Sequence, residues 1–185
     1  EKKSASRFTS RILSYSQSMA DHCTNVANLS VFLALNTGYS HQIMLENIYT
    51  GSLLHDYGKV IINLQGIDKR KKSDKYELEF KRHPEVGRVA LILDSGLNEE
   101  VLRIVYEHHE NHDGTGYPRG IPGSRIYELT KIVSIANYFD QIVMSRKGSI
   151  KENQQFAYQE LEKDEGKMFD PKILEKCLRC LKNIV

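Results

Sequence analysis

The chain has 185 residues, of which 40% are hydrophobic and 27% charged, which is ordinary for one soluble globular domain. The formal net charge of +2 predicts no strong overall attraction to nucleic acid or to a membrane surface. No apolar run is long enough to span a bilayer, and the first residues, EKKSASRF, do not form a signal peptide. We therefore expect a cytoplasmic protein with no DNA partner and no membrane segment.

Three cysteines, Cys23, Cys177 and Cys180, make an odd count that does not indicate a disulfide framework. Cys177 and Cys180 have C-x-x-C spacing, but no strand pattern precedes them, so we interpret them as half-buried helix residues. The chain starts without an initiator Met in a charged, helix-like stretch. We expect residues 1–185 to form a single domain cut from a longer protein, with a sensory or regulatory domain upstream.

Helical periodicity is present throughout and strand-like alternation is not, so the predicted fold class is all-α, a single helical bundle. The first predicted helix runs from about Phe8 to Asn36 and ends at Gly38. The second follows an N-cap at Ser40 and stops at Gly58. We interpret the basic run at 69–72 as a solvated loop face rather than a patch that attracts substrate.

The middle of the chain alternates short helices with loops. We expect a third helix after Ser73 and a fourth that Pro84 opens. Asn98 caps the next helix, which ends near His109. The stretch 111–124 is rich in glycine and proline, which predicts a long ordered loop.

Three more helices complete the chain. Apolar residues from Ile126 to Val143 recur at helical spacing and predict a buried helix. Ser149 and Glu152 form a capping box for the next helix. Asp170, an N-cap, and Pro171, at the first helical position, open the last one.

Histidines are the most informative residues for function. Five of the seven fall at the ends or on the faces of different predicted helices, which is how a bundle builds a metal centre in its core: His22, His55, His83, His108 and His109. Asp56 follows His55 directly, and its carboxylate could bridge two cations. Imidazole and carboxylate ligands suit Fe, Mn or Zn, and the lack of cysteine ligands argues against a structural zinc. Two such cations can activate water and neutralise charge that develops on a phosphate.

A structural interpretation competes with this one at each histidine. We interpret His41 and His112 as ordinary surface or core residues. His22 alone would be ambiguous, because it lies near an apolar helix face. The adjacent pair His108 and His109 is harder to explain by packing, because two imidazoles side by side at a helix end are rarely needed there.

Five segments, in this order, resemble the HD-GYP branch of the HD superfamily of phosphohydrolases. LLHDYGK at 53–59 resembles the HD-x-GK motif, and KRHPEVG at 81–87 resembles HP-x-x-G. HHENHDGTGYP at 108–118 resembles HHE-x-x-DG-x-GYP, the motif that names the branch. FDQIVMSR at 139–146 and FDP at 169–171 resemble its FDALTS-x-R and FDP elements.

The resemblance implies a metal-dependent phosphodiesterase that hydrolyses cyclic di-GMP, a bacterial second messenger, to the linear dinucleotide, to GMP, or to both. It implies two divalent metal ions, with Fe or Mn preferred over Zn or Mg. One metal would be held by His22, His55 and Asp56, and the other by Asp56, His83, His108 and His109.

The resemblance also implies roles for four other residues. Lys59 would place an ammonium beside the scissile phosphate. Tyr117 would stack on or bound a guanine pocket, Asp140 would hydrogen-bond substrate or support the site, and Arg146 would contact phosphate or base. Simpler interpretations stay open for the last three: Tyr117 in a plain turn, Asp140 as a surface charge, and Arg146 as a helix C-cap.

Two positions depart from the family pattern. Asn137 stands where the family has a metal-binding aspartate, three residues before Asp140, and a neutral amide is a poorer ligand for a hard cation. Ser18 stands where members that bind three metals carry glutamate, so we expect at most two metals here.

Two alternatives to a cyclic di-GMP phosphodiesterase stay open. The first is a degenerate HD-GYP binding or interaction module with little turnover because of Asn137. The second, which the GYP segment argues against, is another nucleotide phosphohydrolase of the HD superfamily.

Overall fold

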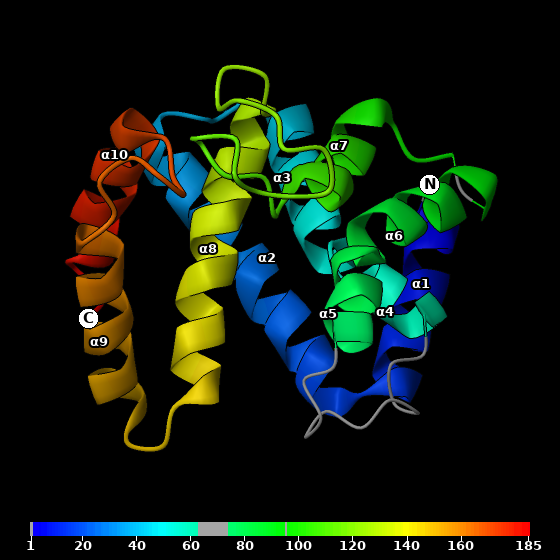
Figure 1. Cartoon of the computed structure of the whole chain (residues 1–185), viewed down its shortest axis with the longest axis horizontal. Coiled ribbons are helices and arrows are strands. Elements are labelled where there is room, and N and C mark those ends of the chain that lie inside the picture. The colour runs from blue at the N-terminus through cyan, green and yellow to red at the C-terminus, as the bar shows by residue number, and fades with distance from the viewer. Residues whose placement is uncertain (1, 63–73, 95) are drawn as a thin grey trace.

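The computed structural model describes residues 2–62, 74–94 and 96–185, and every regular element in those ranges is a helix (Figure 1), which confirms the predicted all-α fold class. The basic run at 69–72 lies outside these ranges. Ten helices occupy the described residues: α1 (Lys2–Tyr15), α2 (Gln17–Thr37), α3 (Gln42–Leu54), α4 (Tyr57–Ile62), α5 (Asp74–Lys81), α6 (His83–Asp94), α7 (Glu99–Glu107), α8 (Glu128–Ser145), α9 (Ile150–Glu162) and α10 (Pro171–Leu181).

The first predicted helix is in fact two helices, so that prediction is wrong at Ser16. The backbone of Ser16 is extended, with φ −163° and ψ 123°, and its hydroxyl accepts a hydrogen bond from the Met19 backbone N–H at 3.3 Å. Serine is a preferred N-cap, so this local bond competes with continuation of the helix. The end of α2 falls at Gly38 as predicted, where φ is 107°.

The second predicted helix is also divided, with a turn at His55 and Asp56 between α3 and α4. Its N-cap is His41 rather than Ser40, and no side chain caps it. Gly58 lies inside α4 instead of ending a helix. Glycine is required at this position because a Cβ atom would lie 1.9 Å from the backbone oxygen of His83. Glycine therefore serves the close packing of α4 against α6 (Figure 1), which brings His83 to the turn.

The other helix starts follow the predicted caps. The Asn98 side chain accepts a hydrogen bond from the Val101 backbone N–H at 3.0 Å. Ser149 and Glu152 form the expected capping box at the start of α9, and Asp170 caps α10.

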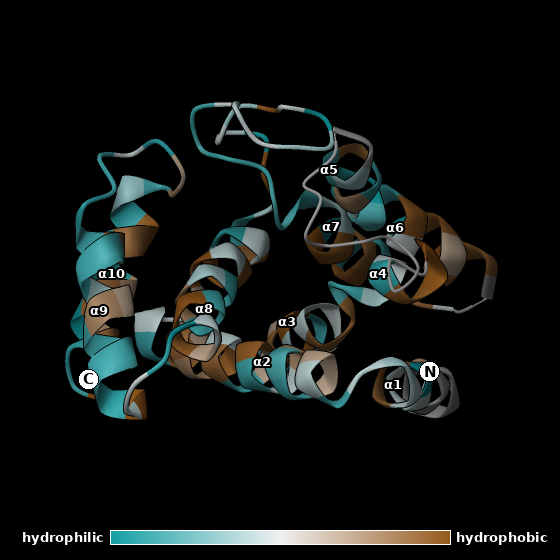
Figure 2. Cartoon of the chain, turned by 60° about the horizontal axis from the view of Figure 1, so that its bottom comes forward, coloured by the Kyte–Doolittle hydropathy of each residue, from teal (hydrophilic) through white to brown (hydrophobic). Residues whose placement is uncertain are grey.

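Two hydrophobic clusters flank the middle of the molecule. The larger joins α2, α3, α8, α9 and α10, and Figure 2 shows hydrophobic residues concentrated where α2, α3 and α8 meet. The smaller joins α1 and α2 to α3, α4, α6 and α7 and includes Phe8, Leu54, Tyr57 and Leu91. Within the described ranges, no helix has the length and apolar character needed to cross a bilayer.

The cysteines are unpaired and packed into helices. Cys23 and Cys177 are buried, and Cys180 is partly buried. Both Cys177 and Cys180 are packing residues of α10, as expected, but only Cys180 is half-buried, because Cys177 lies fully inside the larger cluster.

Candidate metal centre

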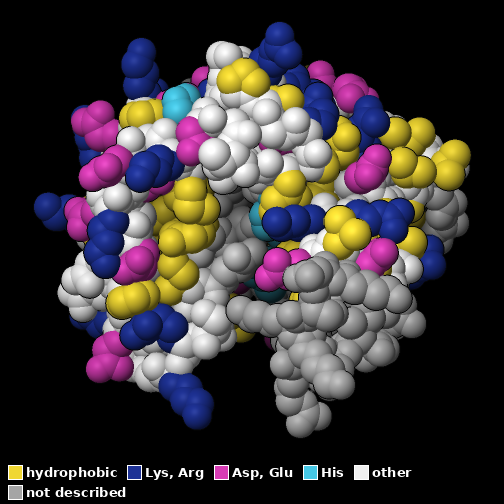
Figure 3. Space-filling model, viewed as in Figure 1, with side chains coloured by type: hydrophobic (Ala, Val, Ile, Leu, Met, Phe, Trp, Pro, Cys, Tyr) yellow, Lys and Arg dark blue, Asp and Glu magenta, His cyan; other side chains and the backbone are white. Residues whose placement is uncertain are grey.

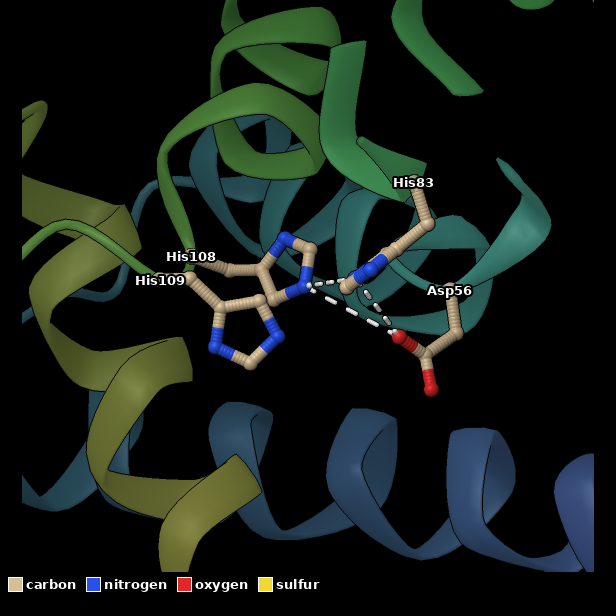
Figure 4. Close-up of side chains that lie close together, drawn as sticks. All are labelled: Asp56, His83, His108 and His109. Atoms are coloured by element: carbon tan, nitrogen blue, oxygen red, sulfur yellow. Dashed lines mark hydrogen bonds and ion pairs between the residues drawn. The ribbon is translucent and has the colours of Figure 1, made fainter. Parts of the chain in front are cut away.

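Six side chains converge between the two hydrophobic clusters. They come from α2, from the turn after α3, from the first residue of α6 and from the end of α7: His22, His55, Asp56, His83, His108 and His109. Figure 4 shows Asp56, His83, His108 and His109 directed toward a common point. One candidate ligand atom from each of these four lies within 4.8 Å of the others, and the same holds for His22, His55 and Asp56.

Backbone carbonyls orient three of the imidazoles. Each imidazole donates its Nδ1–H to the carbonyl oxygen three residues earlier, at 2.6 Å for His55, 2.6 Å for His83 and 2.8 Å for His108. A carbonyl oxygen can only accept, so Nδ1 carries a proton in each ring and Nε2 is the nitrogen directed into the cluster. This is the arrangement that a metal-binding histidine requires.

Burial keeps the imidazoles of His55, His108 and His109 neutral. Desolvation lowers the pKa of His55 to about 4. Desolvation and the neighbouring imidazoles also hold the pKa values of His108 and His109 well below their usual range. Nε2 of His83 and Nε2 of His108 face each other at 3.1 Å, a separation at which both nitrogens could be ligands of one cation.

Several further ligand atoms in the cluster are buried without a hydrogen-bond partner: Nε2 of His22, His55 and His109, and Oδ1 of Asp56. Buried polar atoms in native proteins normally have hydrogen-bond partners, so a group of buried atoms without partners around one centre needs an explanation. Divalent cations coordinated by these nitrogen and oxygen atoms would satisfy all of them. The donor set therefore fits metal ions.

The two oxygens of Asp56 face different histidines. Oδ1 lies 3.3 Å from Nε2 of His83 and 3.8 Å from Nε2 of His108. Oδ2 lies 3.5 Å from Nε2 of His55 and 3.9 Å from Nε2 of His22. One carboxylate thus stands between two groups of imidazoles, as a bridging ligand would.

Asp56 is also paired with Lys59, whose ammonium lies 2.5 Å from Oδ2. Burial raises the pKa of Asp56, but His55 and the Lys59 ammonium lower it further than burial raises it, and the pKa ends well below its usual range. The carboxylate is therefore ionised at neutral pH. The Lys59 side chain, 15% exposed, lies at the edge of the cluster.

Asp140 supports His22 from α8. Its Oδ2 accepts a hydrogen bond from Nδ1 of His22 at 2.6 Å, which leaves Nε2 of that ring directed toward Asp56. Asp140 is only 6% exposed, so the interpretation as a surface charge is wrong. Carboxylates that hold the outer nitrogen of a metal-binding histidine in this way fix its tautomer and orientation.

Asn137 lies one turn before Asp140 and is buried. Its Oδ1 accepts a hydrogen bond from the Gln141 side chain at 2.9 Å. It lines a cavity of about 210 Å³ together with His108 and His109. Position 137 therefore borders the cluster, with an amide where the family has a carboxylate.

The loop at 111–124 is ordered, as predicted, and places Tyr117 over the cluster. The Tyr117 ring stacks on His109, with 4.6 Å between centroids and 22° between planes. Gly116 makes this path possible, because a Cβ atom there would lie 2.2 Å from the backbone nitrogen of Asn111. Tyr117 is thus part of the wall of the site rather than of an isolated turn.

Two buried glutamates that sequence reasoning missed hold this loop. Glu107 accepts hydrogen bonds from the Arg119 guanidinium and the Tyr127 backbone, both at 2.7 Å. Glu110 accepts from the backbone N–H groups of Arg119 at 2.8 Å and Ile121 at 3.1 Å. Glu110 belongs to the HHE motif, which was the available signal, but nothing in the sequence indicates that its partners are backbone amides.

Arg146 is not brought to the cluster in the described part of the chain. It is the C-cap residue of α8, and its guanidinium carbon lies 3.6 Å from the centroid of the Phe156 ring on α9. The helix-end interpretation fits this position better than a phosphate or base contact does. His41 is exposed, and Nδ1 of His112 lies 3.9 Å from Asp170, so neither joins the cluster.

Comparisons with known proteins agree with the motifs. The family model of the HD domain matches residues 7–173, and the chain therefore belongs to the HD domain family. Among curated relatives, a cyclic di-GMP phosphodiesterase of Thermotoga maritima is 31% identical over 165 residues, which cover 88% of this chain and 45% of that protein. The 3'3'-cGAMP-specific phosphodiesterase 1 of Vibrio cholerae is 32% identical over 142 residues, 75% of this chain and 32% of that protein. The chain thus spans less than half the length of these relatives.

Solved structures show the same fold. Bd1817, an HDG"Y"P protein from Bdellovibrio bacteriovorus, matches with a TM-score of 0.70 and 24% identity, covering 88% of this chain and 52% of that one. The PgpH HD domain of L. monocytogenes, in complex with cyclic-di-AMP, matches with a TM-score of 0.71 and 14% identity, covering 96% and 94%. The resemblance to the HD-GYP branch is confirmed.

Proposed function

We propose that this chain is a metal-dependent phosphodiesterase that hydrolyses a cyclic dinucleotide, with cyclic di-GMP as the leading candidate substrate. The observation that carries the proposal is the Asp56 carboxylate between two groups of inward-facing imidazole nitrogens. Relatives named as phosphodiesterases for cyclic di-GMP and for 3'3'-cGAMP support this substrate class. They favour an enzyme over a degenerate binding module.

Two divalent ions, Fe or Mn before Zn or Mg, would be held on the two sides of Asp56. His22 and His55 would complete one site, beside Asn137, and His83, His108 and His109 the other. When bound, the ions would supply an activated water and offset negative charge on the phosphate.

The remaining residues act on the substrate and on the ligands. Lys59 places its ammonium at the edge of the cluster, where it would stabilise charge on the scissile phosphate. Asp140 orients His22, and Tyr117 bounds the site above His109. Hydrolysis of one phosphodiester bond gives the linear dinucleotide, and a second cut gives GMP. We also propose a cytoplasmic location and an upstream regulatory domain; the relatives are longer than the matched region, which leaves room for a further domain in proteins of this kind.

Chromatography of the products tests the proposal. Purified protein, loaded with manganese or reconstituted with ferrous iron, should convert cyclic di-GMP to the linear dinucleotide or GMP. Chelator-treated protein should not. Metal-loaded protein that leaves cyclic di-GMP and 3'3'-cGAMP intact would contradict the proposed function.

A further inference from the structure

An aromatic pocket opens beside the candidate metal centre, between α5 and the loop that carries Tyr117. It has a volume of about 460 Å³, within the range of small-molecule sites. Its lining consists of three aromatic rings and two charged side chains: Tyr76, Phe80, Tyr117, Glu77 and Lys81.

Two of the pocket walls also touch the metal cluster. The Phe80 ring lies 5.1 Å from the His83 ring, and the Lys59 ammonium lies 4.8 Å from the Phe80 centroid. The Tyr117 ring stacks on His109. Figure 3 shows a central hollow in this face of the molecule, with histidine side chains visible at its edge beside hydrophobic and basic ones. A ligand in the pocket would therefore have its phosphate beside Lys59 and the cluster.

The aromatic rings suit a flat heterocycle. Tyr76 and Phe80 are stacked, with 6.1 Å between centroids and 24° between planes, and together form one apolar wall. Tyr117 supplies another wall, with the Lys81 ammonium 5.9 Å from its centroid. Nucleic-acid bases bind to such surfaces by stacking, whichever base is present.

The two charged residues can distinguish one base from another. Glu77 and Lys81 are four residues apart on α5, so they lie on the same helix face. An ionised glutamate only accepts hydrogen bonds, and a lysine ammonium only donates them. Guanine presents an acceptor at O6 and donors at N1 and N2, whereas adenine presents a donor at N6 and an acceptor at N1. Both oxygens of the Glu77 carboxylate can accept hydrogen bonds from the adjacent guanine donors N1–H and N2 while Lys81 donates to O6. Adenine in the same orientation would place its N1 acceptor against the carboxylate and its N6 donor against the ammonium.

The negative charge of Glu77 also favours guanine as the bound base. A carboxylate near a ligand with two phosphates lowers affinity by repulsion unless it binds donor groups of that ligand. The guanine N1–H and N2 amino group are such donors. The Lys81 ammonium, which lies over the Tyr117 ring, can donate to O6 or N7 of a base stacked there.

We propose that this pocket is a guanine subsite in which Glu77 and Lys81 select guanine over adenine. The inference rests on the proposed function and deepens it, because the relatives include phosphodiesterases named for different cyclic dinucleotides. The residues that distinguish guanine from adenine would then lie on α5, outside the metal-binding motifs.

Glu77→Gln tests the proposal with a nearly isosteric change that places an amide donor opposite guanine donors. The KM for cyclic di-GMP should rise about tenfold or more, with kcat little changed, because each such base contact discriminates by roughly this factor. The KM for cyclic di-AMP should stay the same or fall. Glu79→Gln is the matched control, because Glu79 is on the same helix, pairs with Arg82 at 3.0 Å and does not line the pocket.

Calorimetric binding of GMP and AMP separates this inference from the proposed function. The parent protein should bind GMP about tenfold or more tightly than AMP, and Glu77→Gln should lose that preference while Glu79→Gln keeps it. If no cyclic dinucleotide is hydrolysed but the GMP preference depends on Glu77, the function fails and the subsite stands. Equal effects of Glu77→Gln on both nucleotides, or no effect, would overturn the subsite while leaving cyclic di-GMP hydrolysis untouched.

Discussion

Asp56 is the residue on which both halves of the cluster depend, since its two oxygens face separate groups of imidazoles. Asp56→Ala should remove bound metal and lower phosphodiesterase activity by about a hundredfold or more, because loss of a shared ligand weakens both sites. Helical content should stay nearly unchanged, since the side chain supplies ligand atoms rather than packing. Metal analysis, turnover and circular dichroism measure the three effects.

Asp21→Ala is the control for this variant. Asp21 is an exposed carboxylate on α2, next to His22 in the chain but outside the cluster. It should retain parent activity and metal. Parent-level turnover in Asp56→Ala would rule out the assigned mechanism.

A substitution at Asn137 provides a gain-of-function test. Asn137→Asp adds a negative ligand beside a dication in a buried setting, where electrostatic effects are enlarged. Metal occupancy and turnover should therefore rise, by about tenfold for a change near 1.4 kcal/mol. The readouts are metal equivalents per chain and the initial rate of cyclic di-GMP hydrolysis.

Asn183→Asp, an exposed change near the C-terminus, carries the same added charge and should alter neither quantity. An unchanged rate in Asn137→Asp, with metal already bound in full by the parent, would show that the amide is no handicap. That outcome would mean another ligand completes the first site.

At the scale of elements, the contact between α4 and α6 sets the position of His83. Gly58→Ala would force a Cβ atom to 1.9 Å from the His83 backbone oxygen, so the helices must separate. We expect a loss of about 1–3 kcal/mol in the free energy of unfolding, the usual cost of overpacking, and weaker metal binding because His83 moves. Urea denaturation and metal titration measure both.

Gly96→Ala is the matched control, because nothing lies within 4 Å of a Cβ atom at that position. Its unfolding free energy should change by no more than about 0.5 kcal/mol. If Gly58→Ala is equally harmless, the close packing of α4 against α6 does not position the site.

Helix starts could be predicted wherever a capping side chain accepts a hydrogen bond from a backbone N–H two or three residues later. Asn98, Ser149 and Asp170 cap their helices through atoms a few residues away, and this information is local. Gly58 was misread because the reason for glycine there is the backbone of His83, which is distant in sequence. The break at Ser16 was missed because the apolar periodicity continues across it.

The same distinction applies to the candidate site. The ligand residues could be named from motifs, since residue type and order carry the metal chemistry. The partners of Glu107 and Glu110 could not, because they include backbone N–H groups of a loop whose path is fixed only in the folded chain. The contact of Arg146 with Phe156 likewise depends on how α9 packs against the end of α8.

At the scale of the whole molecule, the cluster lies between two hydrophobic cores and draws ligands from helices of both sides. Ions that bind the folded chain but not the unfolded chain stabilise it by mass action. Metal at a hundredfold excess over its Kd contributes about 2.7 kcal/mol, which corresponds to a rise in Tm of about 5–10 °C for a domain of this size.

Thermal unfolding with manganese and with a chelator checks this expectation. Asp56→Ala should lose most of the manganese-dependent shift. A shift of the same size in that variant would place the stabilising ion elsewhere in the protein.

The central claim is that Asp56 is shared by two metal ions, and anomalous diffraction from crystals of the manganese-loaded protein tests it most directly. We expect two anomalous peaks, one beside His22 and His55 and one beside His83, His108 and His109, with Asp56 between them. The peak beside Asn137 should be the weaker. Absence of any peak at the cluster, with Nε2 of His83 and Nε2 of His108 still in direct contact, would contradict the account.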